Sequence, residues 1–197
     1  MPNLCNNSEV EKSDDQLVTD YLNGDEEAFS ALLHRYLKSL YNFSFRLTNE
    51  KAAAEDVAQE AFVKVWKNIS KYHIGGNFKT WIFTIARNAT IDYLRKKKNI
   101  QFSAFESDSG ENFFVENLAD DAPTPEELFV LAEQKELVSN MLQKVSPAQR
   151  EVLILHEGEN MTFDEIGKIL NKPLNTVKSQ HRRALIELRK LLGEYPG

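Results

Sequence analysis

The sequence predicts an all-α protein made of two small helical domains joined by an extended acidic linker. Capping patterns, in which a hydroxyl residue is followed three positions later by Glu or Gln, recur along the chain. Apolar residues recur at three- and four-residue spacing, with little of the alternation that strands require. A polar, acidic stretch near the middle of the 197 residues predicts the linker.

We expect residues 1–13 to be disordered and residues 14–98 to form the first domain. Its first helix begins after Ser13, which stands three residues before Gln16, and stops at Asn23-Gly24. Each such cap contributes about 1 kcal/mol, enough to fix where a helix begins. The next helix is marked by apolar residues on one face: Phe29, Leu32, Leu33, Tyr36 and Leu40.

Two further helices are expected in this domain. In Ala52–Trp66 a buried face is predicted for Ala61, Phe62, Val65 and Trp66, and an exposed face for Asp56, Gln59, Glu60, Val63 and Lys64. A loop with two glycines, Tyr72–Phe78, precedes the second helix, in Gly76–Lys98, which combines aromatic residues with a basic end. Exposed aromatics can stack on unpaired bases, but at helical spacing most of these rings should be core.

Residues 99–123 read as the linker, and residues 124–194 as the second domain. Capping patterns at Thr124-Pro125-x-Glu127 and Ser146-Pro147-x-Gln149 begin its first helices. Apolar residues at Leu128, Leu131, Leu137 and Met141 mark the first of them.

The segment Met161–Lys190 has the pattern of a helix-turn-helix. Thr162 and Glu165 begin a short helix, Phe163–Leu170, in which Gly167 is small enough for close packing. A tight turn, Asn171-Lys172-Pro173, follows, and the second helix is expected to begin near Asn175 as its N-cap.

In that geometry the first turns of the second helix face the major groove of DNA. The exposed side chains are expected to be Thr176, Lys178, Ser179, Arg182 and Arg183, and the inward ones Val177, Ala184, Leu185 and Leu188. Arginine can bind guanine edges with two hydrogen bonds, whereas lysine and serine more often hold phosphates. The alternative is an ordinary bundle helix with a solvated basic face.

The charge is segregated along the chain. The net charge of −6 excludes a globally basic nucleic-acid binder. Residues 61–100 nevertheless hold nine basic and one acidic side chain, and Lys172–Lys190 holds six and one. Residues 1–60 and 101–140 are strongly acidic. Positive charge is therefore concentrated in two segments on either side of an acidic one.

Other site classes have little support. The single cysteine, Cys5, excludes an internal disulfide and a cysteine-cluster metal site. The four histidines, His34, His73, His156 and His181, show no metal or catalytic-triad spacing, so we expect no metal, no cofactor and no catalytic residue. No apolar run approaches the roughly 20 residues of a membrane span, and the polar N-terminus is no secretory signal, which favours a cytoplasmic protein.

Three segments in this order resemble the sigma factors of bacterial RNA polymerase, specifically the extracytoplasmic-function (ECF) class. AEDVAQEAFVKVW is similar to the core-polymerase contact of the family's second region, and FKTWIFTIARNATIDYLRKKK to its strand-opening helix. PLNTVKSQHRRAL is similar to the recognition helix of the fourth region. The resemblance implies a protein that binds core RNA polymerase, recognises the minus-thirty-five and minus-ten promoter elements and helps to melt DNA.

The resemblance also implies roles for single residues. Contacts to the clamp helices of the largest polymerase subunit fall to Asp56, Gln59 and Glu60. Capture of a flipped minus-ten base falls to the loop and helix residues Tyr72, Asn77, Phe78 and Asn88, with Arg95 at the basic end, and the minus-thirty-five contacts to Thr176, Lys178, Ser179, Arg182 and Arg183. Gln180 and His181 depart from the family pattern, and His181, four residues after Val177, is expected at the rim of the core. An anti-sigma factor is an implied partner.

Other interpretations remain open from the residues themselves. A helix-turn-helix repressor or activator with an N-terminal sensor or dimerisation domain explains Met161–Lys190, but gives the basic, aromatic helix in Gly76–Lys98 no purpose. A helical adaptor would tolerate acidic substitutions at Arg182 and Arg183. An enzyme has no constellation of residues to support it.

Shortening the linker tests whether it spans two promoter elements. Its 25 residues, Asn99–Pro123, reach roughly 80–90 Å when extended but only about 25–30 Å when relaxed. Elements twenty base pairs apart lie roughly 70 Å apart. We expect deletion of about ten linker residues to abolish transcription in a run-off assay with core polymerase, with circular dichroism showing both domains still folded. Undiminished transcription would contradict the spanning role.

Overall fold

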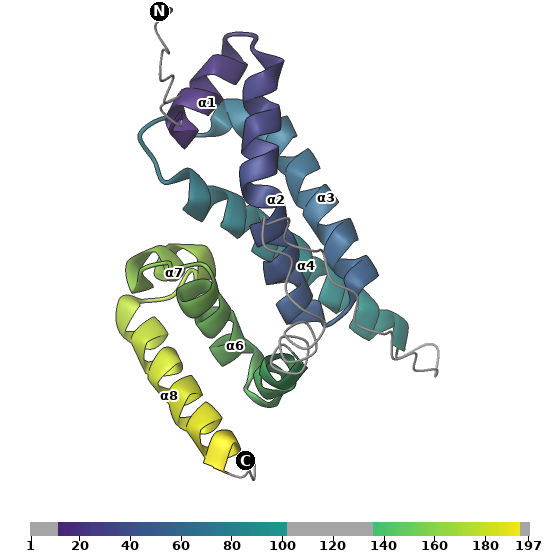
Figure 1. Ribbon diagram of the computed structural model, residues 1–197, viewed down its shortest axis with the longest axis vertical. Coiled ribbons are helices and arrows are strands. Elements are labelled where there is room, and N and C mark those ends of the chain that lie inside the picture. Colours follow the sequence, from purple (N-terminus) through teal and green to yellow (C-terminus); the bar gives the residue numbers. More distant parts are fainter. Residues whose placement is uncertain (1–11, 102–135, 194–197) are drawn as a thin grey trace, which may run out of the picture.

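The computed structural model describes residues 12–101 and 136–193, and every regular element in these two ranges is helical (Figure 1). The all-α prediction is therefore confirmed. Neither range contains a helix that is both long and apolar enough to traverse a lipid bilayer.

The N-terminal half is a bundle of helices. The four α-helices are α1 (Asp14–Leu22), α2 (Glu26–Thr48), α3 (Lys51–Asn68) and α4 (Phe78–Gln101), and a short 3₁₀ turn, η1 (Ile69–Lys71), ends α3. Helices α2, α3 and α4 pack against one another, and α1 packs on α2 (Figure 1). Helix α4 runs to Gln101, three residues past the predicted end of the domain.

The helix boundaries follow from capping chemistry. Ser13 and Gln16 form the predicted capping box, because each side chain accepts a hydrogen bond from the other residue's backbone amide. Helix α1 ends at Asn23, and Gly24 turns the chain with a φ of +104°. Asp25 then caps α2 by accepting from the amide of Glu27 at 3.1 Å.

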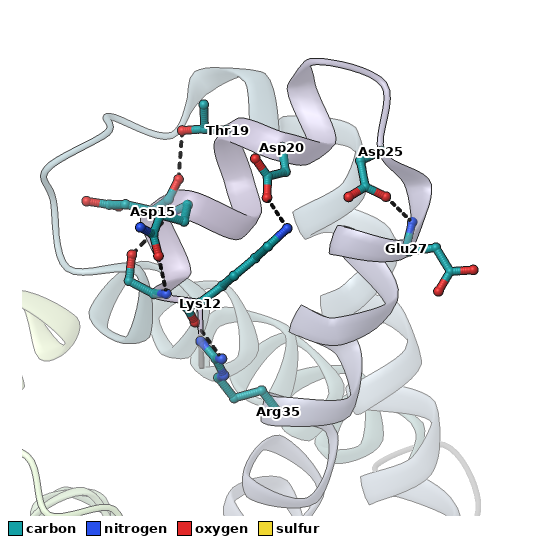
Figure 2. Close-up of polar contacts among 9 residues, drawn as sticks. Lys12, Asp15, Thr19, Asp20, Asp25, Glu27 and Arg35 are labelled. Carbon is teal, nitrogen blue, oxygen red and sulfur yellow. Dashed lines mark hydrogen bonds and ion pairs between the residues drawn. The ribbon is translucent and has the colours of Figure 1, made fainter. Parts of the chain in front are cut away.

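Polar contacts attach α1 to the bundle (Figure 2). Lys12 pairs with Asp20 of α1, with 2.5 Å between Nζ and Oδ2. Arg35 of α2 donates to the backbone carbonyl of Lys12 at 2.8 Å and to the carboxylate of Asp14 at 2.5 Å. Tyr36, also on α2, donates to the other oxygen of Asp14. An acidic residue in the first turn of α1 therefore accepts hydrogen bonds from side chains of α2. Negative charge at this position also interacts favourably with the positive end of the α1 helix dipole.

The core of this half combines aliphatic side chains with buried aromatic rings. Leu32, Tyr36 and Leu40 of α2 are buried as predicted. Phe43 of α2 and Phe83 of α4 have no exposed surface and meet edge to face, with 5.5 Å between ring centroids. Burial of two such rings contributes several kcal/mol to the bundle.

The C-terminal half is a second group of helices. Residues 136–144 are helical, and α6 (Pro147–Leu153), a π-helical turn η2 (Ile154–Gly158), α7 (Phe163–Leu170) and α8 (Leu174–Gly193) follow. The capping boxes predicted at Ser146 and Thr162 are both present. The pattern predicted at Thr124, and the whole predicted linker after Gln101, lie outside the described residues.

Buried apolar side chains of the two halves belong to one continuous cluster. It includes Phe43 and Ile82 from the N-terminal half and Ile154 and Ile166 from the C-terminal half. The sequence predicts two helical groups, but the periodicity of each segment says nothing about how the groups pack on each other.

A substitution at Gly167 tests how tightly the turn after α7 is packed. A Cβ atom there would lie 2.9 Å from the backbone carbonyl oxygen of Lys172, whereas one at Gly193 would meet nothing within 4 Å. Because the obstacle is backbone, we expect Gly167→Ala to lower the free energy of unfolding by about 1–2 kcal/mol. Gly193→Ala is the matched helical control and should leave it unchanged or slightly raised. Chemical denaturation measures both, and equal effects would refute the packing argument.

Candidate nucleic-acid and polymerase interfaces

The helix-turn-helix is built from short-range backbone contacts. Thr162 and Glu165 form the capping box that begins α7. The pKa of the Glu165 carboxyl is lowered, mainly because the Thr162 hydroxyl donates a hydrogen bond to it. Asn171 ends α7 in the left-handed region, with a φ of +50°. The amide of Lys172 then donates to the carbonyl of Gly167 at 2.9 Å, which closes the turn.

The recognition helix α8 begins earlier than predicted. The carbonyl of Pro173 accepts from the amides of Thr176 and Val177, at 2.9 and 3.2 Å, as the carbonyl of an N-cap residue does. Asn175 is therefore inside the first turn and is not the N-cap. Proline can take this position because its missing N–H is not needed there.

The predicted DNA-facing residues form one stripe on α8. Four of them, Lys178, Ser179, Arg182 and Arg183, are exposed, and Thr176 is half-buried. Positions four apart on a helix share a face, so Lys178 stands beside Arg182 and Ser179 beside Arg183. We call these five residues the recognition stripe.

The buried side of α8 is narrower than predicted. Val177 and Ala184 have no exposed surface, and Leu188 packs against the core, as expected. Leu185 is 44% exposed, so its predicted inward position is wrong. Position 185 lies about 100° around the helix from Ala184, which takes it away from the core. His181 sits at the rim as predicted, with its Nε2 2.9 Å from a carboxylate oxygen of Glu157.

The predicted minus-ten residues are only partly exposed. Asn77, Asn88 and Arg95 are exposed. Tyr72 and Phe78 are buried, at 8% and 2% exposure, and their rings meet edge to face with 5.2 Å between centroids. Both rings are buried in this arrangement, so a contact of either ring with a base stays a prediction. They form the hydrophobic support of the loop between them.

Asp15 holds the loop in place from α1. The hydroxyl of Tyr72 donates to one of its carboxylate oxygens at 2.8 Å, and the amide of Gly75 donates to the other at 2.9 Å. Burial, followed by the hydrogen bond to Asp15, raises the pKa of the Tyr72 phenol. Gly75 has a φ of +88°, a left-handed conformation that glycine adopts without strain. Asn77 then accepts from the amide of Thr80 at 2.8 Å and begins α4.

Helix α3 presents the predicted polymerase-facing residues on its outer side. Asp56, Gln59 and Glu60 are all exposed. Val63 is 48% exposed, as predicted, but Trp66, expected in the core, is 54% exposed. Trp66 stands seven residues after Gln59 and three after Val63, so it continues their face of the helix. The exposure of Trp66 could have been predicted from that spacing. The core position was predicted instead because large aromatic rings are usually buried.

The two halves meet through one ion pair and two hydrogen bonds between the N-terminal part of α4 and the C-terminal half. Arg87 of α4 pairs with Glu151 of α6 at 3.2 Å, and Glu151 has a side-chain exposure of only 6%. Lys79 donates to the carbonyl of Glu159 at 2.5 Å, and Asn77 donates to the carboxylate of Glu165 at 2.6 Å. We call these three contacts the α4 junction. The sequence did not predict it.

Helix α2 adds to the same contact region. A Cβ on Gly158 would lie 2.3 Å from a guanidinium nitrogen of Arg46, so the arginine packs directly on this backbone. Burial raises the pKa of the nearby Glu159 carboxyl, against the opposing effects of Lys79, Ser39 and Arg46. Asn49 and Ser139 join the halves at another point, with 3.1 Å between their side-chain oxygens.

One group of side chains that the sequence did not predict could hold a metal ion. His156, Glu157 and His181 each offer a ligand atom, and these atoms lie within 4.8 Å of one another. His156 and His181 lie together in the fold, although their spacing in the sequence is not that of metal ligands. The folding of α8 against η2 brings together residues that are 25 positions apart, which no local spacing could reveal.

Comparisons with known proteins agree with the geometry. Residues 32–100 match the family model "Sigma-70 region 2", and residues 135–188 match "Sigma-70, region 4". The chain is 34% identical over 170 residues to the ECF RNA polymerase sigma factor SigW of Bacillus subtilis, covering 86% of this chain and 91% of the relative. It is 27% identical over 184 residues to the RNA polymerase sigma-H factor of Pseudomonas aeruginosa, covering 93% and 95%.

Solved structures have the same fold. The chain resembles the sigma factor RpoE of Bartonella quintana, solved in complex with the anti-sigma factor NepR, with a TM-score of 0.65 and 25% identity over 85% of this chain and 98% of that one. It also resembles CnrH, solved in complex with the cytosolic domain of CnrY, with a TM-score of 0.71 and 20% identity over 94% and 100%. Together with the close match to SigW, these findings show that the chain belongs to the ECF family of RNA polymerase sigma factors.

Proposed function

We propose that three surfaces of this chain divide the work of a sigma factor, which directs promoter-specific transcription initiation when it is bound to RNA polymerase. The recognition stripe on α8 contacts the minus-thirty-five element. The outer face of α3 contacts the polymerase, and the start of α4 with its loop contacts the minus-ten element. The family is not a class of enzymes, and we assign no catalytic residue.

The recognition stripe is the observation that carries this assignment. Lys178, Ser179, Arg182 and Arg183 point away from the buried Val177 and Ala184 on one short length of α8. One face of this helix packs on the core, and the exposed face carries two adjacent arginines. A helix of this kind is suited to the major groove. The arginines can each make two hydrogen bonds to guanine, and Lys178 and Ser179 can hold phosphates.

The face of α3 supports the polymerase contact because it mixes acidic and apolar groups. Asp56, Gln59 and Glu60 provide polar contacts, and Val63 and Trp66 provide exposed apolar surface beside them. A large ring within a polar rim is typical of residues that carry most of an interface's binding energy. We therefore add Val63 and Trp66 to the polymerase-binding residues.

The minus-ten contact falls to exposed polar groups supported by buried rings. Asn77 and Asn88 can hydrogen-bond an extruded base, and Arg95 can neutralise a phosphate. Tyr72 and Phe78 support the loop from below. We propose that the protein acts on DNA in the cytoplasm and that an anti-sigma factor binds it, because the similar RpoE of Bartonella quintana is solved in complex with the anti-sigma factor NepR.

Charge reversal on the recognition stripe tests the proposed function. We expect Arg182→Glu with Arg183→Glu to lower run-off transcription with purified core polymerase about 100-fold on a cognate promoter, because each lost guanine contact costs about 1–3 kcal/mol. Binding to core polymerase, measured by gel filtration, should be unchanged.

A matched control separates specific contacts from total charge. Arg189 and Lys190 are exposed farther along α8, and Arg189→Glu with Lys190→Glu makes the same change in net charge. This control should retain most of the transcription. An equal loss in both variants, or full transcription by the first, would refute the recognition stripe.

The α4 junction implies that the two halves separate when the protein works. Promoter elements twenty base pairs apart lie roughly 70 Å apart. Asn77, assigned to the minus-ten element, is bonded to Glu165 of the helix-turn-helix at 2.6 Å. We infer that the junction opens before both elements are bound.

A reversible cross-link between the halves tests this opening. Asn49 and Ser139 lie side by side across the halves, so cysteines at both positions can be joined by a short cleavable bis-thiol linker in a Cys5→Ser chain. We expect the joined protein to lose at least 90% of run-off transcription and to recover it when the linker is cleaved. Each single-cysteine variant is the control. Full transcription by the joined protein would show that opening is not needed.

A further inference from the structure

A cluster of two imidazoles and a carboxylate joins η2 to the recognition helix. His156 and Glu157 are consecutive residues of η2, and His181 is on α8. One ligand atom from each lies within 4.8 Å of the other two. None of the three is used by the contacts proposed above for promoter or polymerase.

The ring of His156 is held in a fixed orientation. Its Nδ1 lies 2.7 Å from the backbone carbonyl oxygen of Met161. Because a carbonyl can only accept, Nδ1 carries the proton of the neutral ring and Nε2 carries the lone pair. A histidine that binds a metal is usually oriented this way, by a carbonyl at its other nitrogen.

Aromatic packing fixes the two rings relative to each other. His156 stacks on Phe163, with 4.3 Å between ring centroids and 20° between planes. His181 meets His156 edge to face at 4.8 Å and Phe163 at 5.1 Å. The imidazoles are thus held side by side before any ligand arrives, which lowers the entropy that binding must overcome.

Glu157 completes the cluster from the solvent side. Its carboxylate oxygen is 2.9 Å from Nε2 of His181, and its side chain is 60% exposed while that of His181 is 13% exposed. Because a carboxylate only accepts, Nε2 of His181 carries the proton of this hydrogen bond. An ion that binds both groups displaces that proton and moves the two ligand atoms apart to the roughly 3.3 Å expected around an ion with ligands at about 2.0–2.1 Å. An exposed glutamate can rotate to admit an ion, so the site has an open route from water.

The backbone under the cluster is also unusual. His156 and Glu157 lie in a five-residue π-helical turn that follows α6 directly and ends that helical stretch. Turns of this kind are rare and occur frequently at functional sites.

We propose that His156, Glu157 and His181 bind one divalent transition-metal ion of the Zn²⁺ class, with a fourth position open to water. Two imidazoles and one carboxylate suit Zn²⁺, Co²⁺ and Ni²⁺, whereas Mg²⁺ and Ca²⁺ prefer oxygen ligands. The bound ion ties η2 to α8 at the residue that directly precedes Arg182 and Arg183. Metal occupancy would therefore set the position of the recognition stripe on the helix-turn-helix.

Co²⁺ titration of the untagged full-length chain tests the site. A Cys5→Ser background removes the thiol as a competing ligand. We expect visible absorption bands of bound Co²⁺ that saturate at one ion per chain and that Zn²⁺ displaces. His181→Gln and Glu157→Gln should each weaken binding at least tenfold, and His156→Gln should do the same.

The other two histidines provide matched controls. His34 and His73 are exposed and belong to the N-terminal half, and His34→Gln and His73→Gln should bind Co²⁺ as the parent does. Because Glu157 is mostly exposed, Glu157→Gln should fold normally even if a histidine variant does not, which circular dichroism checks. Zn²⁺ should raise the Tm of the parent more than that of Glu157→Gln at the same Zn²⁺ concentration.

Three results would overturn the proposal. One is the absence of saturable Co²⁺ bands. Another is binding that is equally tight in the parent, Glu157→Gln and His181→Gln. The third is binding lost in His34→Gln or His73→Gln, which would place the ion elsewhere on the surface.

Discussion

The arrangement of this protein depends on the ion pair between Arg87 and Glu151. Both charges are largely out of water, and a buried charge without its partner costs several kcal/mol. Each charge therefore keeps its partner for as long as the two halves are packed together. The pair is shielded from dissolved salt by its burial, so it retains more of its strength at physiological ionic strength than the exposed pairs do.

Helix α4, which carries Arg87, both contacts the C-terminal half and presents side chains to solvent. Helix α4 gives Arg87 and Lys79 to the C-terminal half, and it presents Asn88 and Arg95 to solvent. The positive segment counted along the sequence is therefore not one surface. Part of its charge pairs with an acidic group of the same chain, as Arg87 does with Glu151, and part of it is exposed to solvent.

Local features of the fold could be predicted from the sequence, and contacts between distant segments could not. The capping boxes at Ser13, Ser146 and Thr162 were predicted because the interaction is complete within four residues. The same holds for the buried face of α2. The start of α8 was misplaced, because Asn175 has a strong capping preference and Pro173 competes for the same end of the helix. The α4 junction depends on the path of the chain between the halves, which no local pattern encodes.

In the candidate site, too, local features could be predicted and contacts between distant segments could not. The stripe on α8 follows from helical spacing and was predicted, although its contacts with DNA stay a prediction. Tyr72 and Phe78 were assigned to the minus-ten element only by resemblance, and the sequence did not show that both rings are buried, with the Tyr72 hydroxyl bonded to Asp15. The approach of His156 and His181 depends on tertiary packing alone.

The exposure of Trp66 gives the protein a native optical reporter. The chain has only two tryptophans, and the other, Trp81, is half-buried against the core on α4. An indole that is 54% exposed emits in a polar environment, and it loses that environment when a protein covers it. Occupancy of the α3 face can therefore be followed by intrinsic fluorescence, without any label, while Trp81 reports separately on the bundle beneath it.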